Sequence, residues 1–180
     1  MDVALTRWIN GPAGFHPVLD TILVGFTQLG VPLMVLVVML QWWSKEDRPH
    51  VRHAALASGL SFLFGLAINQ AILLFIHRIR PYDAGISHLI IAPSADWSFP
   101  SDHATASISI VAAFALQRLP RRTMALFLLA FVVCWSRVYV GTHYVTDVLG
   151  GACTGVISAI VVWLLYREGT RFDRLVTSIL

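Results

Sequence analysis

Long apolar segments are the feature that most constrains what this chain can fold into. The 180 residues are 57% hydrophobic and only 13% charged, whereas globular chains carry about 25% charged residues. The sequence therefore predicts an integral membrane protein, an all-α polytopic helix bundle, with residues 1–180 forming a single domain. Within it we expect residues 1–16 to be an interfacial N-terminal piece and residues 167–180 to be a cytoplasmic tail.

The apolar segments predict about five or six transmembrane helices, with five as the working count. The expected spans are residues 17–43, 52–76, 104–117, 123–141 and 145–166. Because a spanning helix needs about 20 mostly apolar residues, the third segment must recruit its flanks. Gly30, Val31 and Pro32 interrupt the first segment. That segment is either one kinked span or an interfacial piece followed by a shorter span.

Basic residues are unevenly divided between the two ends of these spans. Nine follow the first, third and fifth spans: Lys45, Arg48, Arg52, Arg118, Arg121, Arg122, Arg167, Arg171 and Arg174. The other four lie toward the opposite ends: Arg7, Arg78, Arg80 and Arg137. Basic residues concentrate in cytoplasmic loops, so the end that holds the smaller group is predicted to face outward.

Polar residues from several spans are expected to meet at this outer end. They stand at the ends of spans two to five: Arg78, Arg80, Ser101, Asp102, His103, Arg137, His143 and Asp147. Any one of them is explained as a helix cap or as a side chain that extends to the interface. Ionisable groups at membrane depth are costly, however, and usually mark a functional site. Their convergence predicts an active site at the outer membrane–water interface.

The residue types in this cluster indicate that its ligand is a phosphate. His143 and Asp147 are four residues apart and would share one helix face, where the carboxylate can orient the imidazole. Ser101 is expected at a helix N-terminus, whose amides form an anion site. The planar guanidinium groups of Arg80 and Arg137 suit phosphate oxygens.

A second imidazole, His103, is available to donate a proton to a leaving oxygen. A metal site is the competing use of two histidines and several aspartates. We disfavour it because the nearby arginines would repel a divalent cation. We therefore expect no metal and no cofactor, and nothing in the charge pattern indicates nucleic-acid binding.

The spacing of these residues resembles the three-part signature of the phosphatidic acid phosphatase type 2 superfamily, over roughly residues 65–150. The matching parts are Arg80-Pro81, then Pro100-Ser101-Asp102-His103, then Ser136-Arg137 followed by His143 and Asp147. The resemblance implies a metal-independent phosphatase that works through a phosphohistidine. By position it implies these roles: His143 as nucleophile, Asp147 as its orienting partner, His103 as acid and then base, and Arg80, Arg137 and Ser101 as phosphate ligands.

Two positions depart from the pattern of that family. Leu73 stands where the family usually has a lysine, and Asp102 stands where it most often has glycine. On a continuing helix His77 and Arg80 would share the face of Leu73. We therefore expect Arg78, with His77 as a further candidate, to supply part of the missing phosphate contact. Asp102 is assigned to the site and would either bond an arginine or cap the helix.

The form SFPSDHA, with Asn69-Gln70 upstream of HRIRP, resembles the bacterial undecaprenyl pyrophosphate phosphatases within the superfamily. That resemblance implies hydrolysis of undecaprenyl diphosphate to undecaprenyl phosphate, in recycling the carrier lipid for peptidoglycan and other cell-wall polymers. It also implies the bacterial inner membrane as location, with the site facing the periplasm or exterior. In the loop 81–100 we expect His88 and Asp96 to be solvated.

Two alternative functions remain at this point. A phosphatase for phosphatidic acid, phosphatidylglycerophosphate or lipid A would share every catalytic residue. A nonenzymatic anion binder or transporter is disfavoured, because binding alone needs no oriented nucleophile. The lipid substrate and the surrounding membrane lipid are the expected partners, and the sequence does not determine the oligomeric state.

Overall fold

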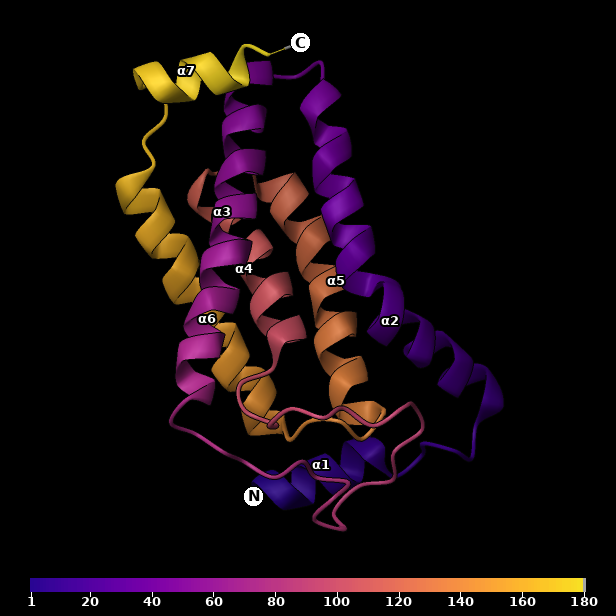
Figure 1. The fold of residues 1–180 in the computed structure, drawn as a ribbon. Coiled ribbons are helices and arrows are strands. Elements are labelled where there is room, and N and C mark those ends of the chain that lie inside the picture. The colour runs from indigo at the N-terminus through magenta and orange to yellow at the C-terminus, as the bar shows by residue number, and fades with distance from the viewer. Residues whose placement is uncertain (180) are drawn as a thin grey trace.

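Helices account for all the regular structure in residues 1–179, the part of the chain that this computed structural model describes. Their order is α1 (Asp2–Asn10), α2 (Pro17–Leu40), the 3₁₀ helix η1 (Gln41–Trp43), α3 (Arg48–Leu73), α4 (Asp102–Leu116), α5 (Pro120–Tyr139), α6 (Val145–Leu165) and α7 (Arg171–Thr177) (Figure 1). The expected all-α fold is confirmed.

Four helical segments are long and apolar enough to cross a membrane: Pro17–Trp43, Arg48–Leu73, Pro120–Tyr139 and Val145–Leu165. The fifth, α4, is apolar but has only 15 residues, as the short third segment of the sequence indicated. Proline occupies the first turn of α2, α3 and α5. A proline costs nothing there, because the N–H it lacks would have no partner inside the helix.

The first apolar segment is one continuous helix, so the single-span alternative is the one observed. Pro32 lies inside α2 without ending it, and Figure 1 shows that α2 bends along its length. A proline removes one backbone hydrogen bond and so permits such a bend.

The second span is shorter at its C-terminal end than the sequence indicated. The helix ends at Leu73 rather than near residue 76, and residues 74–101 form a long non-helical connection. Arg78 and Arg80 therefore lie in a loop and not at a helix end. This loop runs beside α1 at one end of the bundle, while α7 lies at the other end (Figure 1).

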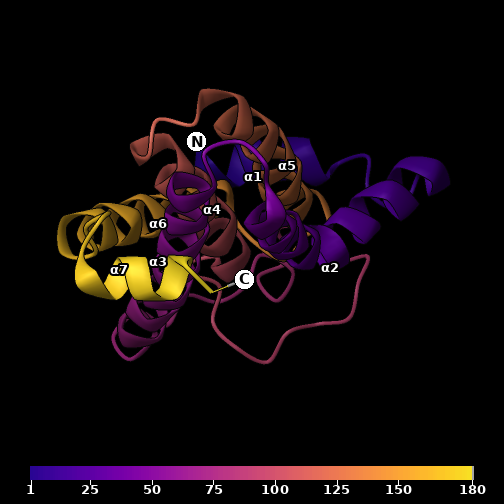
Figure 2. The ribbon, with the colours of Figure 1, turned by 90° about the horizontal axis from the view of Figure 1, so that it is seen from above.

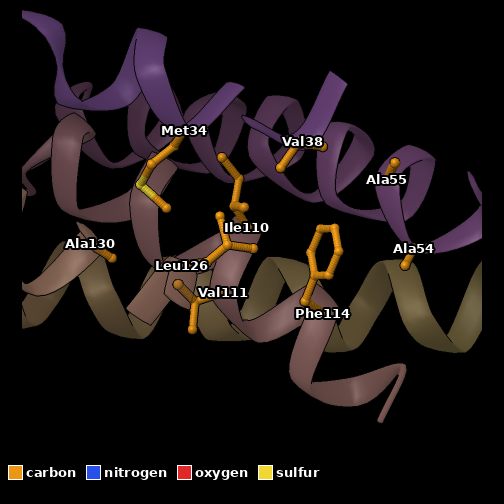
Figure 3. Close-up of a cluster of buried hydrophobic side chains, with 9 residues drawn as sticks. All are labelled: Met34, Val38, Ala54, Ala55, Ile110, Val111, Phe114, Leu126 and Ala130. Carbon is orange, nitrogen blue, oxygen red and sulfur yellow. The ribbon is translucent and has the colours of Figure 1, made fainter. Parts of the chain in front are cut away.

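Helix α4 lies in the middle of the bundle and contacts α2, α3, α5 and α6. Figure 2, viewed along the bundle, shows it surrounded by these helices. A cluster of buried apolar side chains fills the space between four of the helices (Figure 3): Met34, Val38, Ala54, Ala55, Ile110, Val111, Phe114, Leu126 and Ala130. The short helix α4 is thus enclosed by longer helices.

Glycines on α6 let its backbone touch that of α4. A Cβ atom on Gly151 would lie 2.4 Å from the carbonyl oxygen of Ser101, and one on Gly155 would lie 2.7 Å from the carbonyl oxygen of Thr105. Small residues at helix interfaces allow such close approach in membrane proteins. The contact sets the position of the first turn of α4 against the first turns of α6.

The far end of the bundle is fastened by α7 through a buried polar cluster. Asp173 accepts hydrogen bonds from His53 Nδ1 (2.8 Å), Tyr166 Oη (2.6 Å) and the Gly169 amide (2.8 Å). Arg52 donates to the Thr177 carbonyl oxygen at 2.7 Å. Buried polar groups are stable only when paired in this way, so α7 is tied to the start of α3.

Replacing Gly155 with alanine is expected to destabilise the protein. Alanine gains about 1 kcal/mol of helix propensity over glycine, but forcing a methyl group into backbone contact costs about 1–3 kcal/mol. The matched control is Gly59→Ala in α3, where nothing lies within 4 Å of an added Cβ. Thermal unfolding in detergent should give a lower Tm for Gly155→Ala than for Gly59→Ala. Equal Tm values would contradict the close contact.

Candidate active site

The polar residues singled out from the sequence meet at the end of the bundle where α1 lies. They come from four parts of the chain: Arg80 from the loop 74–101, His103 from the first turn of α4, Arg137 from the last turn of α5, and His143 and Asp147 from the start of α6. His103 is half-buried and lies within electrostatic range of Arg137, His143 and Arg80. The predicted convergence is therefore present.

His143 is held with one ring nitrogen available for reaction. Its Nδ1 lies 2.8 Å from the carbonyl oxygen of Ser98. A carbonyl can only accept, so Nδ1 carries the proton and Nε2 carries the lone pair. Nε2 lies 3.4 Å from Nη1 of Arg80. Burial, aided by the charges of Arg137 and Arg80 and opposed by Asp147, lowers the pKa of His143 to about 4. The imidazole is thus neutral near pH 7, as a nucleophile must be.

Asp147 is fully buried beside this imidazole. Its Oδ2 lies 3.6 Å from Nδ1 of His143 and accepts hydrogen bonds from Ser98 Oγ (2.5 Å) and the Tyr144 amide (2.9 Å). His143 itself precedes α6, so the two residues do not share a helix face as expected. They are nevertheless close, because Asp147 lies in the first turn and caps the same helix end.

Ser98 forms hydrogen bonds with both His143 and Asp147, although no role was predicted for it from the sequence. Its carbonyl oxygen accepts from His143 and its hydroxyl donates to Asp147. Its own amide donates to the carbonyl oxygen of Arg78 at 2.9 Å. The one available signal was its place at the head of SFPSDHA, but the role depends on the path of the loop. Ser98 fixes the tautomer of His143 and the orientation of Asp147 together.

Arg80 is buried and oriented by Asp96. The side chain of Asp96 is 54% exposed, in keeping with the expected solvation, but it also forms an ion pair with Arg80 that was not predicted. Arg80 donates from Nε to the Asp96 carbonyl oxygen (2.9 Å), from Nη2 to Asp96 Oδ1 (2.7 Å) and from Nη1 to the Thr142 carbonyl oxygen (3.0 Å). Partial burial raises the pKa of Asp96, but hydrogen bonds from Ser94 and Arg80 outweigh it and lower the pKa. Asp96 therefore stays ionised and keeps Nη1 of Arg80 beside His143.

Two buried polar atoms at the site have no partner among residues 1–179: Nε of Arg137 and Oγ of Ser101. Arg137 donates from Nη1 to Thr27 Oγ1 at 2.9 Å, so only part of its guanidinium is used. Ser101 is the N-cap of α4, as expected, but its side chain makes no capping bond. Buried polar groups are rarely left unpaired, and these two atoms suit the oxygens of an anionic ligand.

Asp102 is tied to the neighbouring helix rather than to an arginine. Its Oδ1 accepts a hydrogen bond from Nδ2 of Asn69 at 2.6 Å, and the same nitrogen lies 2.9 Å from Thr105 Oγ1. The sequence had suggested that Asp102 bonds an arginine or caps α4, and the contact with Asn69 is neither of these. It joins the first turn of α4 to the last turns of α3.

The two residues expected to replace the family lysine have different side-chain partners. Arg78 donates to Asp147, to Asp2 and to Thr146. His77 is exposed, and its ring centroid lies 5.0 Å from that of Trp97. His77 and Arg80 do not share a helix face with Leu73, and that prediction was wrong, because α3 ends at Leu73.

The site combines a neutral imidazole whose Nε2 is unprotonated, two arginines and two unpaired polar atoms. Positive charge and fixed donors stabilise a transferring phosphoryl group, and an imidazole can form a covalent phosphoryl intermediate. Among the described residues, no group of three or more His, Cys, Asp or Glu side chains is arranged to hold a metal ion. The arrangement suits phosphoryl transfer to histidine.

A family model described as the PAP2 superfamily matches residues 33–171. The chain belongs to the PAP2 superfamily. Among curated members, it is 32% identical to undecaprenyl-diphosphatase BcrC of Bacillus subtilis (strain 168), over 93% of this chain and 83% of that one. It is 35% identical to the putative undecaprenyl-diphosphatase YbjG of Escherichia coli (strain K12), over 74% of this chain and 66% of that one.

Two crystal structures of PAP2 proteins resemble this one over almost its whole length. Aquifex aeolicus LpxE gives a TM-score of 0.68 at 26% identity and covers 92% of this chain and 95% of its own. The first transmembrane PAP2-type phosphatidylglycerolphosphate phosphatase from Bacillus subtilis gives a TM-score of 0.69 at 25% identity. This match covers 95% of the present chain and 87% of the Bacillus subtilis chain. With the apolar helices, these findings identify the protein as a multi-pass membrane hydrolase of the PAP2 lipid-phosphatase type.

Removing the carboxylate that orients Arg80 is expected to weaken phosphatase activity. In Asp96→Ala, Arg80 keeps its bonds to backbone carbonyls but loses its ionic partner, so kcat/KM should fall about 10-fold. Asp83→Ala is the matched control, because Asp83 is an exposed aspartate of the same loop. Steady-state assays on a lipid phosphate would compare the two variants. Equal losses, or none in Asp96→Ala, would show that Asp96 does not position Arg80.

Proposed function

We propose that this protein hydrolyses undecaprenyl diphosphate to undecaprenyl phosphate through a phosphohistidine on His143. The observation that carries the proposal is the unprotonated Nε2 of a buried, neutral His143, whose tautomer is fixed by Ser98 and whose Nε2 lies 3.4 Å from Nη1 of Arg80. Simple anion binding would need the cations alone. A nucleophile with a fixed tautomer serves a covalent reaction instead.

The reaction proceeds in two displacements at phosphorus. Nε2 of His143 attacks the terminal phosphorus, the bond to the leaving oxygen breaks, and His103, which enters this step protonated, gives that oxygen a proton and becomes neutral. The neutral His103 then takes a proton from water, whose oxygen attacks the phosphohistidine and releases inorganic phosphate and His143. Asp147 stabilises the positive charge that develops on the His143 ring in the first step.

The phosphoryl oxygens would be held by groups that already surround His143. Arg80 presents Nη1, Arg137 presents its unpaired Nε, and Ser101 presents its unpaired hydroxyl. These groups are preorganised by the protein, so they need little rearrangement when charge develops on the phosphoryl group. We propose Asp102 as a residue that positions this wall of the site through Asn69.

The substrate assignment rests on the two relatives named as undecaprenyl-diphosphatases, of which one is marked putative. A second candidate is favoured by specific relatives as well. Phosphatidylglycerophosphatase B of Bacillus subtilis is 29% identical over 79% of this chain, and one of the similar crystal structures is a phosphatidylglycerolphosphate phosphatase. Both substrates present a terminal phosphate on a membrane-embedded lipid, so the same catalytic residues serve either.

We propose that the site faces the periplasm or exterior of a bacterial inner membrane. The nine basic residues of the predicted cytoplasmic group follow α2, α4 and α6, and the site lies at the end of the bundle beside α1. An excess of arginine and lysine favours the cytoplasmic side. Residues 167–180 would accordingly be the cytoplasmic tail, and residues 1–16 an interfacial piece beside the site.

Replacing the proposed nucleophile is expected to abolish turnover. His143→Ala should lower kcat by at least about 10³-fold. It should also abolish the acid-sensitive phosphohistidine that the unaltered protein forms with a labelled substrate. His16→Ala is the matched control, because His16 precedes α2 at the same end of the bundle. Substantial turnover in His143→Ala would refute the assigned nucleophile, whichever lipid is used.

Substrate choice is tested by comparing kcat/KM in detergent with EDTA present. Undecaprenyl diphosphate is expected to be preferred over phosphatidylglycerophosphate, phosphatidic acid and a lipid A phosphate. A preference for one of the monoesters would move the substrate assignment to that lipid and leave the mechanism intact. If no lipid is hydrolysed while phosphate is bound or transported, the enzymatic proposal fails.

A further inference from the structure

Arg78 lies between two carboxylates at the edge of the site and has little freedom to contact a ligand. Its Nη1 donates to Asp147 Oδ1 at 2.5 Å, and its Nη2 donates to Asp2 Oδ2 at 2.7 Å. Its guanidinium carbon also lies 3.8 Å from the ring centroid of Tyr144. Both terminal nitrogens are therefore directed to protein groups, in contrast to the unpaired Nε of Arg137.

Asp147 needs a cation for a physical reason. Its side chain is fully buried, whereas that of Arg78 is 30% exposed. Burying a charge is costly unless an opposite charge and hydrogen bonds compensate it. The ion pair with Arg78 supplies that compensation and holds the carboxylate beside the ring of His143, which becomes cationic when it is phosphorylated.

Helix α1 holds Arg78 in this place from the other side. Asp2 accepts from Arg78 and also from the Thr146 amide (3.1 Å) and the Thr146 hydroxyl (2.6 Å). Further along α1, Thr6 Oγ1 accepts from the Val145 amide at 3.2 Å. The start of α6, which carries Asp147, is thus bound to α1 through backbone and side-chain groups together.

We propose that Arg78, held by Asp2 of α1, is a positioning residue that keeps the carboxylate of Asp147 in place beside His143, and that it is not a phosphate ligand. This role rests on the proposed phosphohistidine mechanism. It replaces the phosphate contact predicted for Arg78 from the sequence. It also gives helix α1 a role in the active site, because Asp2 of α1 holds Arg78 in position.

The test separates turnover from phosphate binding. In Arg78→Met, kcat for undecaprenyl diphosphate should fall about 10- to 100-fold, the effect of losing a charged hydrogen bond. KM and the affinity for inorganic vanadate, a phosphate mimic measured by calorimetry, should change by less than about 3-fold. Arg78→Lys should recover part of kcat, since an ammonium can neutralise Asp147 but cannot also bridge Asp2.

A second variant keeps the proposal testable if Arg78→Met does not fold. Asp2→Asn retains an acceptor for the Thr146 amide but loses the charge that holds Arg78. It should lower kcat about 3- to 10-fold with vanadate affinity unchanged. The matched control is Arg7→Met, because Arg7 is an exposed cation on the same helix. Its kcat, KM and Tm should equal those of the unaltered protein.

Specific outcomes overturn the proposal. If vanadate affinity falls in step with kcat in the Arg78 variants, Arg78 is a phosphate ligand. If kcat is unchanged in both Arg78→Met and Asp2→Asn, neither residue positions Asp147. The vanadate measurement is independent of lipid hydrolysis, so it decides the ligand question even if the proposed substrate is wrong. A failure of the proposed function would appear separately, as an unaltered protein that hydrolyses no lipid phosphate.

Discussion

A fully buried carboxylate, Asp147, is the constraint on which the rest of the site depends. Charge in such a place is stable only when hydrogen bonds and a cation surround it. Here three donors come from two parts of the chain: Ser98 and Arg78 from the long loop, and the Tyr144 amide from just before α6. The hydrogen bonds that Ser98 and Arg78 donate to Asp147 therefore fix the loop 74–101 against the start of α6. His143, which bonds to the same Ser98, is placed by that arrangement.

The sequence was sufficient to predict the helices and the residues that meet at the site. Apolar length identified the four long helical segments and the shorter α4, because a membrane-spanning helix must be long and apolar enough to cross the hydrocarbon core. The convergence of Arg80, His103, Arg137 and His143 followed from which helix ends share a membrane side. These predictions depend on length, charge placement and spacing, which a sequence carries directly.

The contacts within the loop could not be predicted in the same way. Ser98 was given no role, and Asp96 was expected only to be solvated, because their contacts depend on how an irregular segment of backbone folds. The helix-face argument for His77 failed because α3 ends at Leu73, and no strong stop signal stands there. Asp102 was expected to bond an arginine or cap its helix, but its partner Asn69 lies on another helix. Long-range pairing of polar side chains is decided by tertiary packing, which local patterns do not record.

The glycine contact between α6 and α4 has a consequence for the spacing of two histidines. His103 lies two residues after Ser101, whose carbonyl oxygen faces Gly151, and His143 lies just before the helix that carries Gly151. The two histidines are therefore carried by main chains that touch directly, and their spacing does not rely on a layer of flexible side chains between the helices.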